Sequence, residues 1–148
     1  MKKYLYITAY SLVKIYWFIF RPKTFGVRCL VESEDGREVL LVKHTYMYRN
    51  YWSAPGGKRN KNESLEETAK REIREELGID IYDARKVGEY NARSHFRFDK
   101  VGLFVAKTKD KNFKKDEGEI LEAKWFEKNN LPESIFIATR QILEKTSS

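Results

Sequence analysis

The segment from residue 64 to residue 78 constrains the fold most, because it predicts an amphipathic helix with both ends marked. Ser64 is followed three residues later by Glu67, the pattern of a capping box, in which the two side chains satisfy each other's backbone N–H groups. Gly78 suits the left-handed position just past a helix end. Between these limits an apolar residue recurs every fourth position, at Leu65, Ala69, Ile73 and Leu77. This stripe predicts a helix that packs one face against a sheet.

Three glutamates stand beside this stripe at positions i, i+3 and i+4 of the predicted helix, namely Glu72, Glu75 and Glu76. Like charges at this spacing, with Cβ atoms about 6 Å apart, repel one another. A hard divalent cation removes that repulsion, and oxygen ligands suit Mg²⁺ or Mn²⁺ rather than zinc. The alternative is an exposed acidic face held by ion pairs. The basic residues available for such pairs are Lys70, Arg71 and Arg74.

The residues around this helix resemble the Nudix box. Gly57, Glu63 and the run from Arg71 to Ile79 match the family pattern G-x5-E-x7-R-E-U-x-E-E-x-G-U at every specified position, where U is aliphatic. Nudix proteins are similar in fold, a mixed sheet between helices, and most hydrolyse a diphosphate that links a nucleoside to another group. The resemblance therefore implies an α/β (α+β) fold of the Nudix type, an α/β/α sandwich.

The resemblance also implies a metal site and a catalytic base. The implied ligands of Mg²⁺ or Mn²⁺ are Glu72, Glu75, Glu76 and the backbone carbonyl of Gly56. One of the glutamates, or another from a later loop, is implied as the base that deprotonates the attacking water. The implied reaction is hydrolysis of a phosphoanhydride bond in a nucleoside diphosphate derivative or a nucleoside triphosphate.

Four further residues complete the implied site. Glu119 is the first candidate for the additional ligand or base from a later loop, and Glu117 is the second, because spacing alone does not decide between them. Glu63 and Arg71 resemble the pair that ties the preceding loop to the helix and so orients the metal ligands.

The rest of the chain predicts the other layers of the sandwich. Residues 24–32 alternate between apolar and polar, the dipeptide Asp35-Gly36 predicts a hairpin turn, and residues 39–44 predict a strand covered on both faces. Residues 85–98 predict one strand or a bent pair, and residues 101–106 a buried strand. A final helix is expected to open at Leu131.

Side chains next to these elements are candidates for substrate binding. Lys43 and His44 end the second strand on opposite faces, and Lys43 is the candidate for phosphate, whereas a structural or surface role is expected for His44. Tyr46 and Tyr48 are candidates for stacking on a nucleobase, whereas Trp52 is expected in the core. The remaining candidates, for which a solvated surface is the alternative, are Lys58, Arg93 and Arg97.

Residues 4–20 are apolar and aromatic apart from Thr8, Ser11 and Lys14. They predict an extra N-terminal helix, so that a region 1–22 precedes a Nudix domain at 23–148. Lys14 inside the run and its short length disfavour a signal peptide or a membrane span. Two interpretations remain: the helix packs on its own domain or on the partner in a homodimer, or it makes peripheral contact with a membrane, flanked by basic residues.

Composition narrows the functional classes. The 148 residues, 41% of them hydrophobic, fit one globular domain beside that helix. The net charge of +7 attracts polyanions, which keeps an RNA 5′-end pyrophosphohydrolase as an alternative to an enzyme for small nucleotides. A non-catalytic module that binds a nucleotide or RNA is a third interpretation, and the retained carboxylates argue against it. The single cysteine, Cys29, fits a reducing compartment, so a cytoplasmic location is expected.

Overall fold

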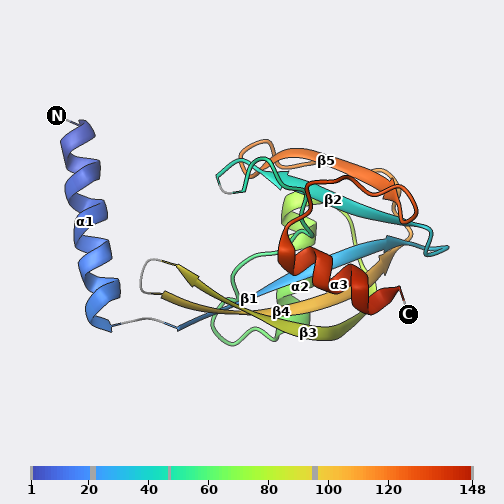
Figure 1. Cartoon of the computed structure of the whole chain (residues 1–148), viewed down its shortest axis with the longest axis horizontal. Helices are drawn as coiled ribbons and strands as arrows, with labels where there is room; N and C mark the ends of the chain where they lie inside the picture. Colours follow the sequence, from blue (N-terminus) through green and yellow to red (C-terminus); the bar gives the residue numbers. More distant parts are fainter. Residues whose placement is uncertain (1, 21–22, 47, 95–96, 148) are drawn as a thin grey trace.

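A five-stranded mixed sheet lies between two helices, and a third helix stands apart from it (Figure 1). The computed structural model describes residues 2–20, 23–46, 48–94 and 97–147. The sheet order is β3-β4-β1-β2-β5, in which β1 and β4 run parallel and the other neighbours antiparallel. The elements are α1 (Lys2–Phe20), β1 (Lys23–Ser33), β2 (Glu38–His44), α2 (Leu65–Leu77), β3 (Tyr82–Ser94), β4 (Arg97–Thr108), β5 (Ile120–Glu127) and α3 (Ile137–Thr146). The predicted fold class, a mixed sheet between helices, is confirmed.

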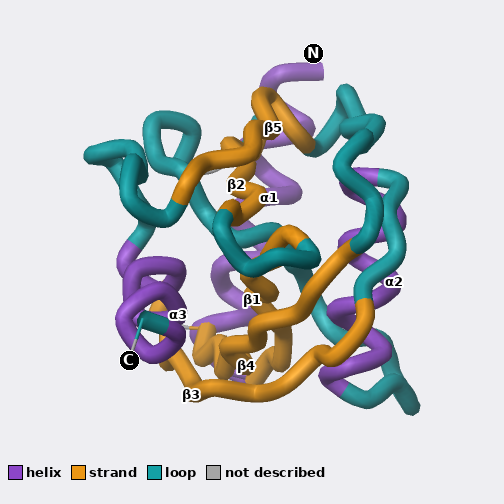
Figure 2. The backbone as a smooth tube through the Cα atoms, turned by 90° about the vertical axis from the view of Figure 1, so that its right-hand side faces the viewer, coloured by secondary structure: helices purple, strands orange, loops and turns teal. Residues whose placement is uncertain are grey.

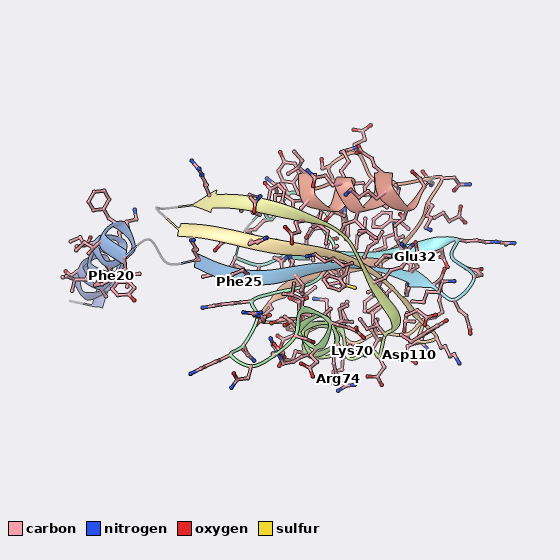
Figure 3. The ribbon with its side chains drawn as sticks, turned by 90° about the horizontal axis from the view of Figure 1, so that it is seen from below. Phe20, Phe25, Glu32, Lys70, Arg74 and Asp110 are labelled. Atoms are coloured by element: carbon pink, nitrogen blue, oxygen red, sulfur yellow. The ribbon has the colours of Figure 1, made fainter. Side chains whose placement is uncertain are left out.

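Helix α2 covers one face of the sheet through the predicted apolar stripe. Ser64 and Glu67 form the capping box, and Gly78 takes the left-handed conformation with φ of 65°. Ile73 and Leu77 are completely buried against β1 and β4, and each contributes about 1.5–3 kcal/mol through burial of its side chain. Cys29 lies in the same cluster, where burial raises the pKa of its thiol. In Figure 3, Lys70 and Arg74 lie on the side of α2 away from the sheet.

Helix α3 covers the opposite face, as Figure 2 shows, and it begins later than the sequence predicts. Its buried residues Ala138 and Ile142 pack on side chains of β1, β2 and β4. Residues 131–136, expected in this helix, are not helical, because Trp52 N–H donates to the carbonyl of Ser134 and Phe136 N–H donates to the carbonyl of Trp52. Backbone pairing with a distant segment thus delays the helix to Ile137.

Strands β3 and β4 form an antiparallel hairpin where the sequence left open one strand or a bent pair. Ser94 pairs with Arg97, and Arg93 pairs with Phe98, so the chain reverses between them. The bent pair is therefore the alternative that the structure shows. Residues 95 and 96 lie outside the described residues.

Helix α1 makes little contact with the sheet, and Figure 1 shows it on its own at one side of the domain. Its described side chains include apolar groups exposed by 41–65%, among them Leu12, Ile15, Ile19 and Phe20. Packing of this helix on its own domain, one of the two interpretations left by the sequence, is not observed for these side chains. Among the described residues, no helix is both long and apolar enough to cross a membrane.

Candidate active site

The segment of residues 53–59 fills a gap between β1 and β2 and sets the position of the site. The two strands pair with each other only at Val31 and Glu32 of β1. Towards its start, β1 pairs with the inserted segment instead: Cys29 N–H donates to Pro55 O and Val27 N–H to Gly57 O, both at 2.9 Å. The loop before α2 is therefore held as an additional short strand, which satisfies the backbone groups of β1.

Two glycines in this segment allow a close approach that no side chain permits. A Cβ atom on Gly56 would lie 2.0 Å from the carbonyl oxygen of Val27, and one on Gly57 would lie 2.5 Å from the carboxyl carbon of Glu72. The first contact is with rigid backbone and the second with a half-buried carboxylate. Glycine at both positions thus lets the loop pass between β1 and the acidic edge of α2.

Three carboxylates from two elements meet beside these glycines. Oxygen atoms of Glu72, Glu76 and Glu119 all lie within 4.8 Å of one another. The first two come from α2, and Glu119 comes from the loop that precedes β5. Burial and the charge of Glu76 raise the pKa of Glu119, and burial raises the pKa of Glu72 against the opposing hydrogen bond from Arg71. The cluster therefore carries unbalanced negative charge.

Glu119 reaches α2 because its loop completes the end of that helix. The last carbonyl groups of a helix lack intrahelical partners. Here Asp116 N–H donates to the carbonyl of Glu76 at 2.8 Å, and Lys114 N–H donates to that of Leu77 at 3.0 Å. Thr45, just after β2, donates its N–H to the carbonyl of Glu119. These bonds place the loop between α2 and β2.

Glu76 is the most deeply buried of the three glutamates, with 1% of its surface exposed. Its Oε2 accepts from the N–H of Gly56 at 3.2 Å, whereas its Oε1 has no hydrogen-bond partner among the described residues. A buried carboxylate oxygen without a partner is costly. This orphaned oxygen and the all-oxygen donor set fit a hard divalent cation such as Mg²⁺ or Mn²⁺.

Arg71 holds the loop and the helix together through every branch of its guanidinium. It donates to both oxygens of Glu63, at 2.7 and 3.0 Å, to Glu72 Oε1 at 2.8 Å, and to the carbonyl of Lys58 at 2.9 Å. This bidentate bond, together with the backbone N–H of Asn60, lowers the pKa of Glu63 to about 2. The structure thus contains the contact between Glu63 and Arg71 that the resemblance implies.

Two of the predicted carboxylates are not brought into the cluster. Glu75 is 59% exposed and accepts from Arg71 at 3.2 Å, so its side chain turns towards solvent on the outer edge of α2. Glu117 is 82% exposed and pairs with Lys115 at 2.8 Å. The structure thus selects Glu119 over Glu117 at the cluster, a choice that spacing left open.

A cleft of about 270 Å³ opens beside the cluster, lined among others by Tyr46, Lys58, Phe25, Arg28 and both glycines of the inserted segment. Tyr46 is 62% exposed. Partial burial and then the charges of Glu76 and Glu119 raise the pKa of its hydroxyl, and Arg28 opposes them. Two of the predicted substrate ligands, Tyr46 and Lys58, therefore line one cleft, and its two glycines also adjoin Glu76 and Glu72.

The other predicted substrate ligands lie elsewhere. Lys43 points to the face of the sheet that α3 covers, where it pairs with Glu122 at 3.1 Å and lies over the ring of Trp52. Tyr48 stacks on Phe136 with ring centroids 4.6 Å apart. Arg93 is exposed on the edge strand β3, and the side chain of Arg97 lies outside the described part of the chain.

His44 is the residue whose place the sequence did not reveal. It is 2% exposed, and its Nε2 lies 3.5 Å from Oε1 of Glu76. Strand alternation puts it on the same face as Val42, beneath α2, opposite to Lys43. The alternation of side chains along β2 could have placed His44 on the face that α2 covers. It does not show how deeply the carboxylate site is buried.

Comparisons with known proteins agree with this geometry. The family model described as "NUDIX domain" matches residues 22–145. The chain is 28% identical to the NAD-capped RNA hydrolase NudC of Vibrio atlanticus over 119 residues, and 33% identical to that of Mycobacterium tuberculosis over 109 residues. These matches cover 79% and 72% of this chain but only 44% and 33% of the relatives, so the chain spans less than half of their length.

Solved structures show the same fold. The MutT NUDIX hydrolase from Burkholderia pseudomallei superimposes with a TM-score of 0.73 at 26% identity, covering 84% of this chain and 98% of that one. The NUDIX domain of Shewanella oneidensis NrtR, solved with ADP ribose, gives a TM-score of 0.72 at 18% identity and covers 87% of this chain and 89% of that one. The second likeness, at this identity, concerns the fold alone.

The placement of Glu119 and Glu117 on one loop provides a matched test of the metal site. Because Glu119 lies in the cluster, Glu119→Gln is expected to weaken Mn²⁺ binding by at least about tenfold, the lower limit usual for groups that merely support a ligand. Glu117→Gln also removes one negative charge, but from a side chain that is 82% exposed, and it is expected to leave the Mn²⁺ affinity unchanged. Isothermal titration of Mn²⁺ into the two variants measures both; equal affinities contradict the assignment.

The lowered pKa of Glu63 predicts how stability depends on pH. The carboxyl titrates at about 2 in the folded chain against an ordinary value of 4.5, so the ionised form stabilises the fold. This stabilisation is complete above pH 4.5 and disappears as the pH falls towards 2. Glu63→Gln is therefore expected to lower the melting temperature at pH 6 and to approach the unmodified protein near pH 2, as followed by circular dichroism. A constant difference would contradict this.

Proposed function

The chain belongs to the Nudix hydrolase family, and on that premise we propose that it hydrolyses a phosphoanhydride bond in a nucleoside diphosphate derivative or a nucleoside triphosphate. The observation that carries the proposal is the cluster of Glu72, Glu76 and Glu119 beside the two glycines of the cleft that Tyr46 lines. The expected products of such a cut are a nucleoside monophosphate and a second phosphorylated group or pyrophosphate.

The carboxylates of Glu72, Glu76 and Glu119 would hold Mg²⁺ or Mn²⁺, and the backbone of Gly56 borders the same site. When bound, the cation neutralises charge on the phosphoryl oxygens and favours ionisation of the attacking water. Glu75, implied as a ligand by the resemblance, would need to leave Arg71 to join them. We propose the first three as ligands and Glu75 as a residue that reaches the site only by such a change.

Glu72 is the best placed base of the site. Arg71 donates to its Oε1, and no described residue donates to its Oε2, which leaves that oxygen to accept the proton of water. The hydrogen bond from Arg71 also fixes the direction of the carboxylate. Arg71 in turn is fixed by Glu63 on the opposite side of the guanidinium.

The cleft supports a nucleotide as substrate. Tyr46 offers a partly exposed aromatic face for a base, and Lys58 lines the same cleft as a candidate for phosphate. Lys43 and Tyr48 are engaged with Glu122 and Phe136 instead, so we propose no contact of theirs with a small nucleotide.

A second substrate class is the 5′ end of RNA. The relatives named as NAD-capped RNA hydrolases favour it, as does the net charge of +7, which attracts a polyanion. Both substrate classes present a phosphoanhydride to the same carboxylates, so one site serves either. A non-catalytic binding module explains the geometry less well, because it has no need for three converging glutamates.

Helix α1 would supply a contact with an anionic membrane surface. Its exposed apolar side chains, the lysines at its start and the basic residues that follow it in the sequence are typical of a helix that lies in the lipid interface. A cytoplasmic location fits the buried, unpaired Cys29.

Sedimentation with anionic vesicles is expected for the full chain and not for residues 23–148, which should keep their fold. Vesicle-independent dimerisation of the full chain would instead assign α1 to a homodimer.

The substrate and the base are tested together. We expect Mg²⁺- or Mn²⁺-dependent release of a monophosphate from at least one member of a panel of nucleoside triphosphates, ADP-ribose, dinucleotides and NAD-capped RNA. Glu72→Gln is expected to lower this turnover by about 10²–10⁴-fold, the usual contribution of a general base. Glu66→Gln, on the exposed side of the same helix and paired with Lys70, is the control and should retain full turnover. A panel without hydrolysis would contradict the function.

A further inference from the structure

Two buried polar atoms face each other behind the carboxylate cluster. Nε2 of His44 and Oε1 of Glu76 are the buried side-chain atoms without a hydrogen-bond partner in the described part of the chain. They lie 3.5 Å apart, and their side chains are 3% and 1% exposed. An approach of about half an ångström would bring them within the usual N–H···O distance.

Ser53 is the hydrogen-bond neighbour of the other ring nitrogen of His44. Its buried hydroxyl lies 3.4 Å from Nδ1 and also 3.4 Å from the carbonyl oxygen of Val42, so its single hydrogen serves one of these two acceptors. When it serves Nδ1, a neutral imidazole carries its own hydrogen on Nε2. The hydrogen on Nε2 would point at Oε1 of Glu76.

His44 stands behind the cluster and not within it. Among the described residues, the group of candidate ligand atoms consists of Glu72, Glu76 and Glu119, and no atom of His44 shares it. The contact that His44 offers to the cluster is the one with Glu76, at 3.5 Å. The N–H of Gly56 already holds Oε2 at 3.2 Å, so a donor at Oε1 would fix the carboxylate from both sides.

Holding the carboxylate of Glu76 in one direction stabilises the site more at this buried position than it would on an exposed surface. A buried carboxylate oxygen left without a donor destabilises the folded state, and the carboxylate can turn to escape that cost. An imidazole held by Ser53 would remove the cost without introducing a further charge into the acidic cluster. Ser53 and Gly56 belong to the same inserted segment, so the position of this segment would set the direction of Glu76.

We propose that His44 is a positioning residue that donates from Nε2 to Oε1 of Glu76 and so holds this carboxylate in the direction required for metal binding. The inference rests on the proposed function, because it assigns the support of that metal site. The inference assigns the strand β2 a role in the site. The motif on α2 that matches the family pattern contains no residue of this strand.

The test compares variants of His44 in the full chain by isothermal titration of Mn²⁺. His44→Phe keeps a ring but has no donor, and we expect it to raise the dissociation constant about 10–100-fold, the usual cost of losing a group that orients a ligand. His44→Gln restores an N–H donor and should bring the dissociation constant to within about threefold of the unmodified protein. If the Phe variant does not fold, His44→Leu provides the same comparison.

Val42→Ala is the matched control, because Val42 lies two residues earlier on the same face of β2 and is completely buried. It should lower the melting temperature without changing Mn²⁺ affinity. Unchanged affinity in the donor-free variants overturns the inference alone, as does a Gln variant as weak as the Phe variant. Failure of the unmodified protein to bind Mn²⁺ contradicts the proposed function as well.

Discussion

Repulsion among Glu72, Glu76 and Glu119 is the constraint around which this structure is arranged. Bringing three carboxylates within 4.8 Å of one another opposes folding unless other groups hold them there. The capped helix α2 carries two of them on a stripe anchored by buried apolar residues, and a loop fastened to the end of that helix carries the third. The stability of the hydrophobic layers is what allows the acidic cluster to persist, as is usual where a site is built against local preference.

A second layer of contacts keeps the carboxylates in a useful direction. Arg71 joins Glu63, the carbonyl of Lys58 and Glu72, so that the loop and the helix form one unit. On the other side, the segment of residues 53–59 is held against β1 by backbone hydrogen bonds, and its N–H at Gly56 reaches Glu76. The site is thus supported from the loop, from the helix and from the strand β1.

The same arrangement relates the fold to chemistry. The inserted segment separates β1 from β2 at one end, and the cleft opens there beside the carboxylates. A nucleotide lying along the cleft would place its phosphoanhydride near the cluster and its base near Tyr46. The family relationship supports this interpretation of the domain. Helix α1 lies apart from the domain and bears instead on where the protein resides.

The sequence by itself determined the helix that carries the carboxylates, because its caps, its four-residue apolar period and its glutamates are local features that the tertiary structure did not alter. It also determined the buried strand at residues 39–42, and the motif identified the family. Only the tertiary structure decided between Glu119 and Glu117, turned Glu75 outward, placed Lys43 and His44 on their particular faces, and delayed α3 to Ile137. Apart from Glu75, which is held by Arg71 on the same helix, each of these depends on backbone hydrogen bonds or packing between segments distant in the chain, and no local pattern encodes such pairings.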